Sequence, residues 1–165
     1  MSEEPDRKPP EAPHREQPVT PVPQRRAVGI EDAEALRLLG SVPMGRIAFT
    51  RQALPTIRPV NHIVDDGNIV IRTHEGAALT SRTLQANGPG VVVAYEADAI
   101  DPDTHVGWSV VVTGYAHLVT DAHELARYQA LLRPWVRQPM DYAVRIHPDL
   151  VTGLLLVPAD QSAEA

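Results

Sequence analysis

Three short strands separated only by tight turns restrict the fold of this chain more than any other feature. They lie within residues 45–79, and β-branched, alternating apolar residues place them over 46–50, 56–64 and 68–73. Asp-Asp-Gly-Asn at residues 65–68 is a strong hairpin signal, because Gly and Asn accept the positive φ of tight hairpin turns. This part of the chain is therefore expected to pair antiparallel.

The rest of the chain adds further strands and three short helices. Strands are expected over residues 91–97, 107–120, 142–146 and 150–157, and helices over 31–40, 76–87 and 121–133. Gly114 lies in the middle of an unusually long strand, which indicates a bend or bulge of the kind that barrels use to turn corners. About seven strands in adjacent runs, without β-α alternation, favour a mainly β fold, an antiparallel barrel with helices at its ends.

The two ends of the chain differ from its middle in composition. Seven of the sixteen prolines lie before residue 29, with almost no large apolar side chains, so this segment cannot bury enough surface to offset its ordering entropy. We expect residues 1–28 to form a disordered proline-rich tail, residues 29–158 to form one folded domain, and residues 159–165 to be a frayed C-terminus.

Composition excludes several classes of function. The net charge of −6 argues against a general nucleic-acid binder, and the absence of cysteine excludes disulfides, thiolate metal sites and cysteine nucleophiles. No apolar run approaches the roughly 20 residues of a membrane span, and the N-terminus has no secretory apolar core. A cytoplasmic protein with small-molecule or protein partners is expected, without binding to nucleic acid or membrane.

Sequence motifs of common enzymes are missing. His74-Glu75 starts like a zinc-protease helix, but the residue where the second histidine belongs is Ala78. The seven histidines form no closely spaced ligand set, so no metal site is expected, although one assembled from distant residues stays open. No Gly-x-Ser-x-Gly elbow, dinucleotide fingerprint or phosphate-binding loop is present.

Two places in the central strands are candidates for ligand binding. Arg72 and Thr73 end a strand just before the expected helix start at Gly76, and the free N–H groups and dipole of a helix start favour an anion. A solvated surface arginine is the alternative. Pro59 removes a hydrogen-bond donor from its strand, which indicates either an ordinary edge strand or backbone groups that face a ligand.

Four sequence blocks resemble one family. GRIAF, PTIRPVNHIVDDGNIVIRTHEGAAL, VAYEADAIDPDTHVGWSVVVTGYAHLV and VTGLLLV are similar to the pyridoxamine 5′-phosphate oxidase-like flavin-binding proteins, especially the small actinobacterial kind. The resemblance covers residues 31–157. It implies an antiparallel split β-barrel of the Greek-key type, paired into a homodimer, with FMN held in clefts at the subunit interface.

The resemblance also implies roles for individual residues. Those beside the isoalloxazine ring would be Arg58, Pro59, Val60 and Asn61; those at the ribityl phosphate would be Arg72, Thr73, Gly76, Ala77, Ala78 and Leu79; and Trp108 would approach from the partner subunit, with a core position as the alternative. Many relatives have a lysine where this chain has Ala78, so Arg82 or His74 would have to compensate for the lost charge.

The resemblance leads to an FMN-dependent oxidoreductase that passes a hydride between the flavin and a small organic acceptor. The alternatives are a deazaflavin-dependent reductase of the same fold and a non-catalytic flavin- or haem-binding or sensing module that signals through its tail. Catalytic residues are unknown; Tyr115, His62 and His117 are candidates only by position. The C-terminal segment lacks the arginine and histidine of the name-giving enzymes, so pyridoxamine phosphate oxidation itself is not expected.

Overall fold

The computed structural model describes residues 24–74, 78–85 and 90–159, without the side chains of Ala78, Arg82 and Gln85. This part of the chain forms seven strands and three helices, in the order β1 Arg25–Ile30, α1 Asp32–Leu39, β2 Met44–Arg51, β3 Leu54–Asp65, β4 Asn68–Thr73, α2 Ala78–Gln85, β5 Val91–Ile100, β6 Gly107–Leu118, α3 Ala122–Leu131 and β7 Tyr142–Pro158.

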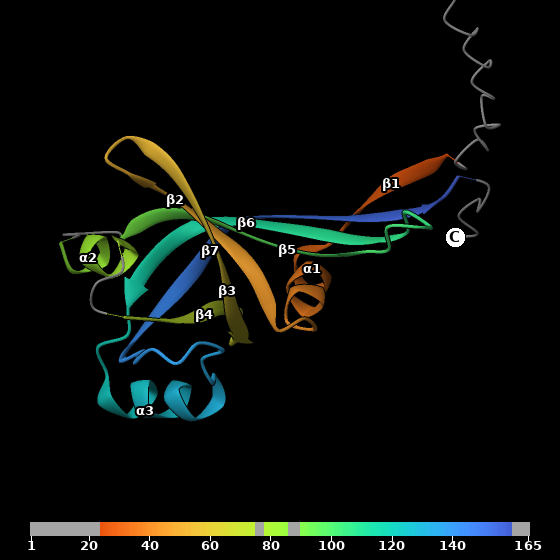
Figure 1. Cartoon of the computed structure of the whole chain (residues 1–165). Helices are drawn as coiled ribbons and strands as arrows, with labels where there is room; N and C mark the ends of the chain where they lie inside the picture. Colours follow the sequence, from red (N-terminus) through yellow and green to blue (C-terminus); the bar gives the residue numbers. More distant parts are fainter. Residues whose placement is uncertain (1–23, 75–77, 86–89, 160–165) are drawn as a thin grey trace, which may run out of the picture.

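The strands form one antiparallel sheet that closes on itself. Its order is β1-β7-β4-β3-β2-β5-β6, and β6 also pairs with β7, so six strands make a ring and β1 lies outside it. The ends of β5, β6 and β7 extend with β1 as an arm, away from α2 and α3 (Figure 1). The predicted mainly β, antiparallel barrel is therefore confirmed, with its helices around the strands.

Strand β7 is a single element of 17 residues, so the prediction of two strands over 142–146 and 150–157 was wrong. The first part of β7 pairs with β4, the last part pairs with β1, and β6 runs along both parts. The β6–β7 register shifts immediately before Gly114, where β7 carries an extra residue. The bend expected at Gly114 is present, and it lets β7 continue from the barrel into the arm.

Strand β1 was missed by the sequence analysis, which assigned residues 1–28 to the tail. Residues 25–28 instead pair with the second half of β7. The side chain of Arg25 also donates from Nε to the carbonyl oxygen of Thr104 at 2.7 Å. A weak local pattern becomes a strand here because the free edge of β7 supplies the hydrogen-bond partners. The predictions for residues 1–23 and 160–165 lie outside the described residues.

The core lies inside the ring, where every second residue of the long strands is buried. Its β5 and β6 members are Val91, Val93, Tyr95, Ala97, Val110, Val112 and Ala116. Helix α1 covers one end of this core with Ala35 and Leu39. Helix α3 packs outside β4 and β7 over a second cluster formed by Val70, Val119, Tyr128 and Ala143. None of the described helices is long and apolar enough to cross a membrane.

Helix α3 is held in place at its start, near its middle and by the residue that follows its end. Asp121 accepts a hydrogen bond from the backbone N–H of Glu124 at 2.8 Å, as the predicted cap requires. Near the middle of α3, the Tyr128 hydroxyl donates to the Asp65 carboxylate at 2.7 Å. Leu132 follows the helix and is buried. The chain segment that continues to β7 therefore starts from a fixed point beside β4.

Candidate functional site

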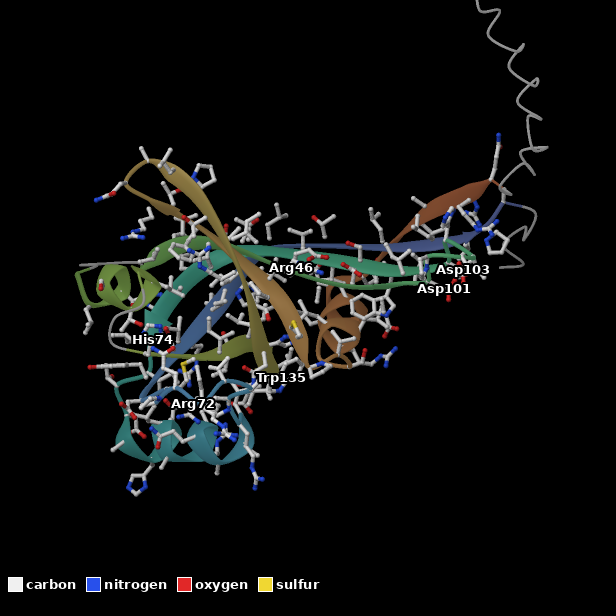
Figure 2. The ribbon with its side chains drawn as sticks, in the orientation of Figure 1. Arg46, Arg72, His74, Asp101, Asp103 and Trp135 are labelled. Carbon is white, nitrogen blue, oxygen red and sulfur yellow. The ribbon has the colours of Figure 1, made fainter. Side chains whose placement is uncertain are left out.

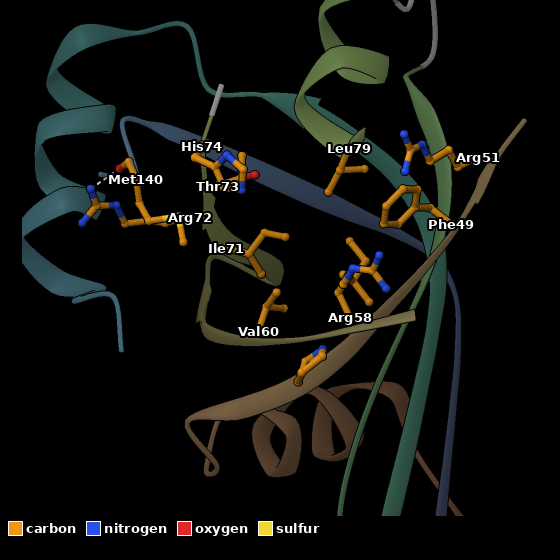
Figure 3. A pocket seen from close by; sticks show the side chains of 12 residues that line it. Phe49, Arg51, Arg58, Val60, Ile71, Arg72, Thr73, His74, Leu79 and Met140 are labelled. Atoms are coloured by element: carbon orange, nitrogen blue, oxygen red, sulfur yellow. Dashed lines mark hydrogen bonds between the residues drawn. The ribbon is translucent and has the colours of Figure 1, made fainter. Parts of the chain in front are cut away.

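A cavity of about 350 Å³ opens between β2, β3, β4 and α2 (Figure 3). Its lining residues are Ile47, Phe49, Arg51, Arg58, Pro59, Val60, Ile71, Arg72, Thr73, His74, Leu79 and Met140. Most of the wall is aliphatic or aromatic, with several cationic side chains around it. A volume at the lower end of the ~300–1,000 Å³ range of small-molecule sites suits a ligand with an apolar body and an anionic group.

Strand alternation places two arginines on the cavity side of the sheet. On β2, Ile47, Phe49 and Arg51 point to the same face because they are two residues apart. Ile47 pairs with Arg58 of β3, which brings that guanidinium to the same face. Arg51 and Arg58 consequently lie near Phe49 and Leu79 in Figure 3, at the α2 end of the cavity.

These two arginines have no carboxylate partner in the described part of the chain. Arg58 Nη1 donates to the carbonyl oxygen of its neighbour Ile57 at 2.8 Å, and Arg51 has no hydrogen bond or ion pair with any of the described residues. Within residues 24–74, 78–85 and 90–159, no aspartate or glutamate lines the cavity. An excess of positive charge without internal neutralisation attracts an anion to this end of the cavity.

Arg72 lines the cavity, but its guanidinium is already engaged elsewhere. Nη1 donates to the carbonyl oxygen of Leu132 at 3.2 Å, Nη2 donates to that of Met140, and Nε is buried without a partner among the described atoms. Along β4, Arg72 shares the face of Val70, which packs toward α3. Figure 3 shows the side chain directed toward Met140 and away from Arg51 and Arg58.

The hydroxyl of Thr73 is engaged as well. Thr80 Oγ1 donates its only proton to the carbonyl oxygen of His74 at 2.8 Å, so in the 3.0 Å contact between Thr73 and Thr80 the donor must be Thr73. The Thr73 proton therefore holds α2 against β4. Arg72 and Thr73 thus both have protein partners already. Their predicted phosphate contacts stay predictions from the resemblance.

The other predicted cofactor residues are partly brought together. Pro59, Val60 and Leu79 line the cavity with Arg58. Asn61 lies on the opposite face of β3, where its Nδ2 donates to the carbonyl oxygen of Arg133 at 2.9 Å. The segment 58–61, which the resemblance places beside the flavin ring, therefore has side chains on both faces of β3.

The predictions for five further residues are not decided by this geometry. Gly76 and Ala77 lie outside the described residues, and so do the side chains of Ala78 and Arg82. Trp108 is half-buried against the core on β6 and does not line the cavity of its own chain. Its predicted approach from a partner subunit stays a prediction.

A second cavity of about 260 Å³ adjoins the first. Its lining residues are Met44, Pro59, Val60, Asn61, Arg72, Pro134, Trp135, Val136 and Met140. Four of these line both cavities: Pro59, Val60, Arg72 and Met140. The sequence analysis missed the segment 132–141, which carries no motif. It also missed Arg51, although the alternation of Ile47, Phe49 and Arg51 was a usable signal.

A buried pair of polar side chains lies beneath Val60. His62 Nε2 is 2.8 Å from the carbonyl oxygen of Leu39, which can only accept, so Nε2 carries the proton and Nδ1 accepts from the Tyr95 hydroxyl at 2.7 Å. Burial lowers the pKa of His62 against the opposing effect of the Leu39 carbonyl, and burial raises the pKa of Tyr95. This pair joins α1, β3 and β5 in one fixed tautomer.

Stability is expected to decrease in mild acid because of His62. The unfolded chain takes up a proton near the ordinary histidine pKa of about 6.5, whereas the lowered pKa keeps the folded imidazole neutral to lower pH. The unfolded state then binds more protons, so the free energy of unfolding falls as the pH drops below that value. Guanidinium unfolding between pH 7.5 and 5 measures the slope, which for one proton is at most about 1.4 kcal/mol per pH unit.

His62→Gln is the matched control, because an amide can donate to Leu39 and accept from Tyr95 without titrating. Its unfolding free energy is expected to depend less on pH than that of the wild type. Parallel profiles would show that His62 does not titrate differently in the two states.

Acid-base candidates are few in this site. His62 is buried beside the barrel core, and neither Tyr115 nor His117 lines either of the two cavities. Among the residues that the structure describes, no group of three or more His, Asp or Glu side chains is arranged to hold a metal ion. The geometry therefore supports the binding of an anionic ligand with an apolar body more directly than it supports proton transfer.

Comparisons with known proteins agree with this architecture. Residues 31–154 match the family model described as pyridoxamine 5′-phosphate oxidase. The chain is 51% identical over 138 residues to "Uncharacterized protein Rv0080" of Mycobacterium tuberculosis, covering 84% of this chain and 91% of that protein.

Two solved structures are similar as well. The FAD binding protein from Mycobacterium smegmatis is 32% identical, with a TM-score of 0.62, over 78% of this chain and 98% of that one. A putative pyridoxamine 5′-phosphate oxidase from Corynebacterium glutamicum is 33% identical, with a TM-score of 0.65, over 81% and 96%. The split-barrel fold that the resemblance implied is thereby confirmed.

Proposed function

The chain belongs to the pyridoxamine 5′-phosphate oxidase family, and on that premise we propose that it binds FMN in the cavity between β2, β3 and β4 and acts as a flavin-dependent oxidoreductase. One observation carries the proposal. The cavity combines apolar walls with two arginines at one end, Arg51 and Arg58, that lack a carboxylate partner among the described residues. A flat apolar ring joined to a phosphate has the matching distribution of polarity.

In this proposal the ring lies against the β3 segment that contains Pro59 and Val60, with Ile71 on the facing strand. The phosphate lies at Arg51 and Arg58, which supply the positive charge that the alanine at position 78 does not. Proline has no N–H for the sheet, so its neighbours' backbone groups are available to a ligand.

The flavin would supply the hydride chemistry, and the protein would supply binding, orientation and exclusion of water. His74 also lines the cavity. The described part of the lining contains no carboxylate that would repel the anionic cofactor. The acceptor is proposed to be a small organic molecule.

The absorption spectrum of the purified protein tests the proposal, before and after FMN is added and the sample is desalted. Retained flavin bands support it. The M. smegmatis relative is an FAD binding protein, so FAD is measured in parallel; the cavity of about 350 Å³ favours the smaller mononucleotide. Retention of a deazaflavin alone would overturn FMN in favour of that cofactor. Retention of none of the three would favour the non-catalytic module.

The same family premise leads us to propose a homodimer. The outer face of β5, β6 and β7 carries exposed apolar side chains, namely Val92, Val111, Leu150 and Leu154. Exposed apolar side chains gathered on one face of a sheet mark interaction sites. We place the subunit contact on this face.

A charge introduced into this face is expected to weaken the dimer. In Leu150→Glu, a side chain that is 61% exposed becomes charged, and its burial between subunits would then desolvate a carboxylate without a partner. Sedimentation velocity at micromolar concentration should show a shift from dimer to monomer. Leu131→Glu is the control, because Leu131 is similarly exposed but lies on α3. Equal dimer content in both variants would move the interface to another surface.

A further inference from the structure

The second cavity has a different character from the first. Three of its rim side chains are large, apolar and exposed: Trp135 at 61%, Val136 at 55% and Met44 at 41%. Trp135 and Arg72 lie on the α3 side of the barrel in Figure 2. Burial of apolar surface contributes roughly 25 cal/mol per Å². A concave cluster of exposed apolar side chains is therefore a favourable place for an apolar ligand.

The cavity offers no free charge to a ligand. Among the residues that the structure describes, its lining contains no aspartate, glutamate, lysine or histidine, and Arg72 is the only charged one. Both Nη groups of Arg72 donate to backbone carbonyls, and its Nε is inaccessible to solvent. Since a charged ligand would lose its hydration without gaining a partner, the site selects uncharged compounds.

Arg72 holds the wall of this cavity in place. The carbonyl groups that it binds belong to Leu132 and Met140, at the two ends of a segment that also contains Trp135 and Val136. Asn61 adds a third bond, to the carbonyl oxygen of Arg133. One guanidinium therefore fixes both ends of an irregular segment, which a single ammonium could do less well because it lacks the planar fork.

The size and chemistry of the lining restrict the ligand further. About 260 Å³ lies below the usual range for drug-sized ligands, so one or two rings fit. The indole of Trp135 offers a stacking face, and the side chains of Met44 and Met140 adapt to a flat surface. Asn61 Nδ2 is taken by a carbonyl, which leaves its Oδ1 as an acceptor for an O–H or N–H group.

We propose that the second cavity binds an uncharged, flat aromatic compound of one or two rings, and that Arg72 is a positioning residue that holds the segment 132–140 as its wall. Because the two cavities share Pro59 and Val60, a compound here would lie beside the flavin site and would be its organic acceptor. Only this last step rests on the proposed function; the binding site itself does not.

Equilibrium dialysis with 2-naphthol tests the site on the full-length protein. Naphthalene-2-sulfonate is the charged control probe, because it has the same rings. We expect 2-naphthol to bind at least tenfold more tightly in the wild type than in Trp135→Ala. Leu84→Ala, which truncates an exposed apolar side chain that lines neither cavity, should bind it like the wild type. Binding of the sulfonate at the cationic first cavity would not respond to Trp135→Ala.

The role of Arg72 is tested by chemical rescue. Arg72→Ala should lower the affinity for 2-naphthol about tenfold and increase amide hydrogen exchange within residues 132–140. Guanidinium ions at low millimolar concentration should restore the affinity in Arg72→Ala, and ammonium ions at the same concentration should not. A general loss of packing would raise exchange throughout the barrel and would not be rescued.

Three results would overturn the proposal: no binding of 2-naphthol, equal binding by Trp135→Ala, or stronger binding of the sulfonate at a site that Trp135→Ala abolishes. Affinity in Arg72→Ala equal to the wild type would remove the positioning role. Flavin retention is read from the absorbance of the same samples. Naphthol binding without flavin retention would therefore refute the proposed function and leave this site standing.

Discussion

Gly114→Ala is expected to destabilise the barrel by about 3 kcal/mol or more, or to prevent folding. A Cβ at this position would lie 2.0 Å from the carbonyl oxygen of His147 and 2.9 Å from its carbonyl carbon. Both are backbone atoms of the neighbouring strand, so no side chain can rotate away, and relief requires β6 and β7 to separate at the register shift. Overpacking costs typically about 1–3 kcal/mol, and backbone collisions lie at or above the upper end.

Gly29→Ala is the matched control. Gly29 also lies in a strand paired with β7, but a Cβ there would have no atom within 4 Å. Its unfolding free energy should stay within about 0.5 kcal/mol of the wild type. Guanidinium unfolding followed by circular dichroism measures both variants. A Gly114→Ala protein as stable as Gly29→Ala would mean that the bulge relaxes freely, contrary to its proposed role as the corner of the barrel.

Removing Arg51 and Arg58 is expected to abolish flavin retention. A hydrogen bond to a charged group contributes about 1.5–3 kcal/mol, so each single alanine variant should weaken FMN binding about 10- to 150-fold. The double variant should lose at least about 100-fold, because no other cation of the lining faces the α2 end of the cavity without a protein partner in the described structure. Quenching of FMN fluorescence on titration gives the affinities.

The control for charge is Arg37→Ala, which changes the net charge by the same amount as each single variant, on the exposed surface of α1. It should bind FMN like the wild type. Unchanged affinity in the double variant would return the phosphate to Arg72 and the start of α2, where the resemblance placed it. Loss of binding in both Arg37→Ala and the double variant would indicate a long-range effect of net charge.

The local elements were predictable because their signals are local. The hairpin at residues 65–68 is confirmed, with positive φ at Asp66 and Gly67. Gly114 was identified as a bend from its position in a long strand, and the Asp121 cap from its spacing to Glu124. Strand β1 could not be found in this way, because six residues become a strand only through the edge of β7, more than a hundred residues later.

The candidate site was predictable in its location and less so in its individual contacts. Arg58, Pro59, Val60 and Leu79 do line the cavity. Arg72 and Thr73 were treated as one phosphate seat, although consecutive strand residues point to opposite faces. That period of two was visible in the sequence.

The sequence by itself determined the strands β2 to β6, the tight hairpin, the bend at Gly114 and the region of the chain that carries cationic residues, since each depends on residues close together in the chain. Only the tertiary structure decided which cations stay available to a ligand. Arg72 is occupied by the carbonyl groups of Leu132 and Met140, some sixty residues away, while Arg51 and Arg58 lie on one face of the paired strands β2 and β3 without a carboxylate partner among the described residues. The availability of a charged group depends on the partners that folding brings to it, and a local pattern does not contain them.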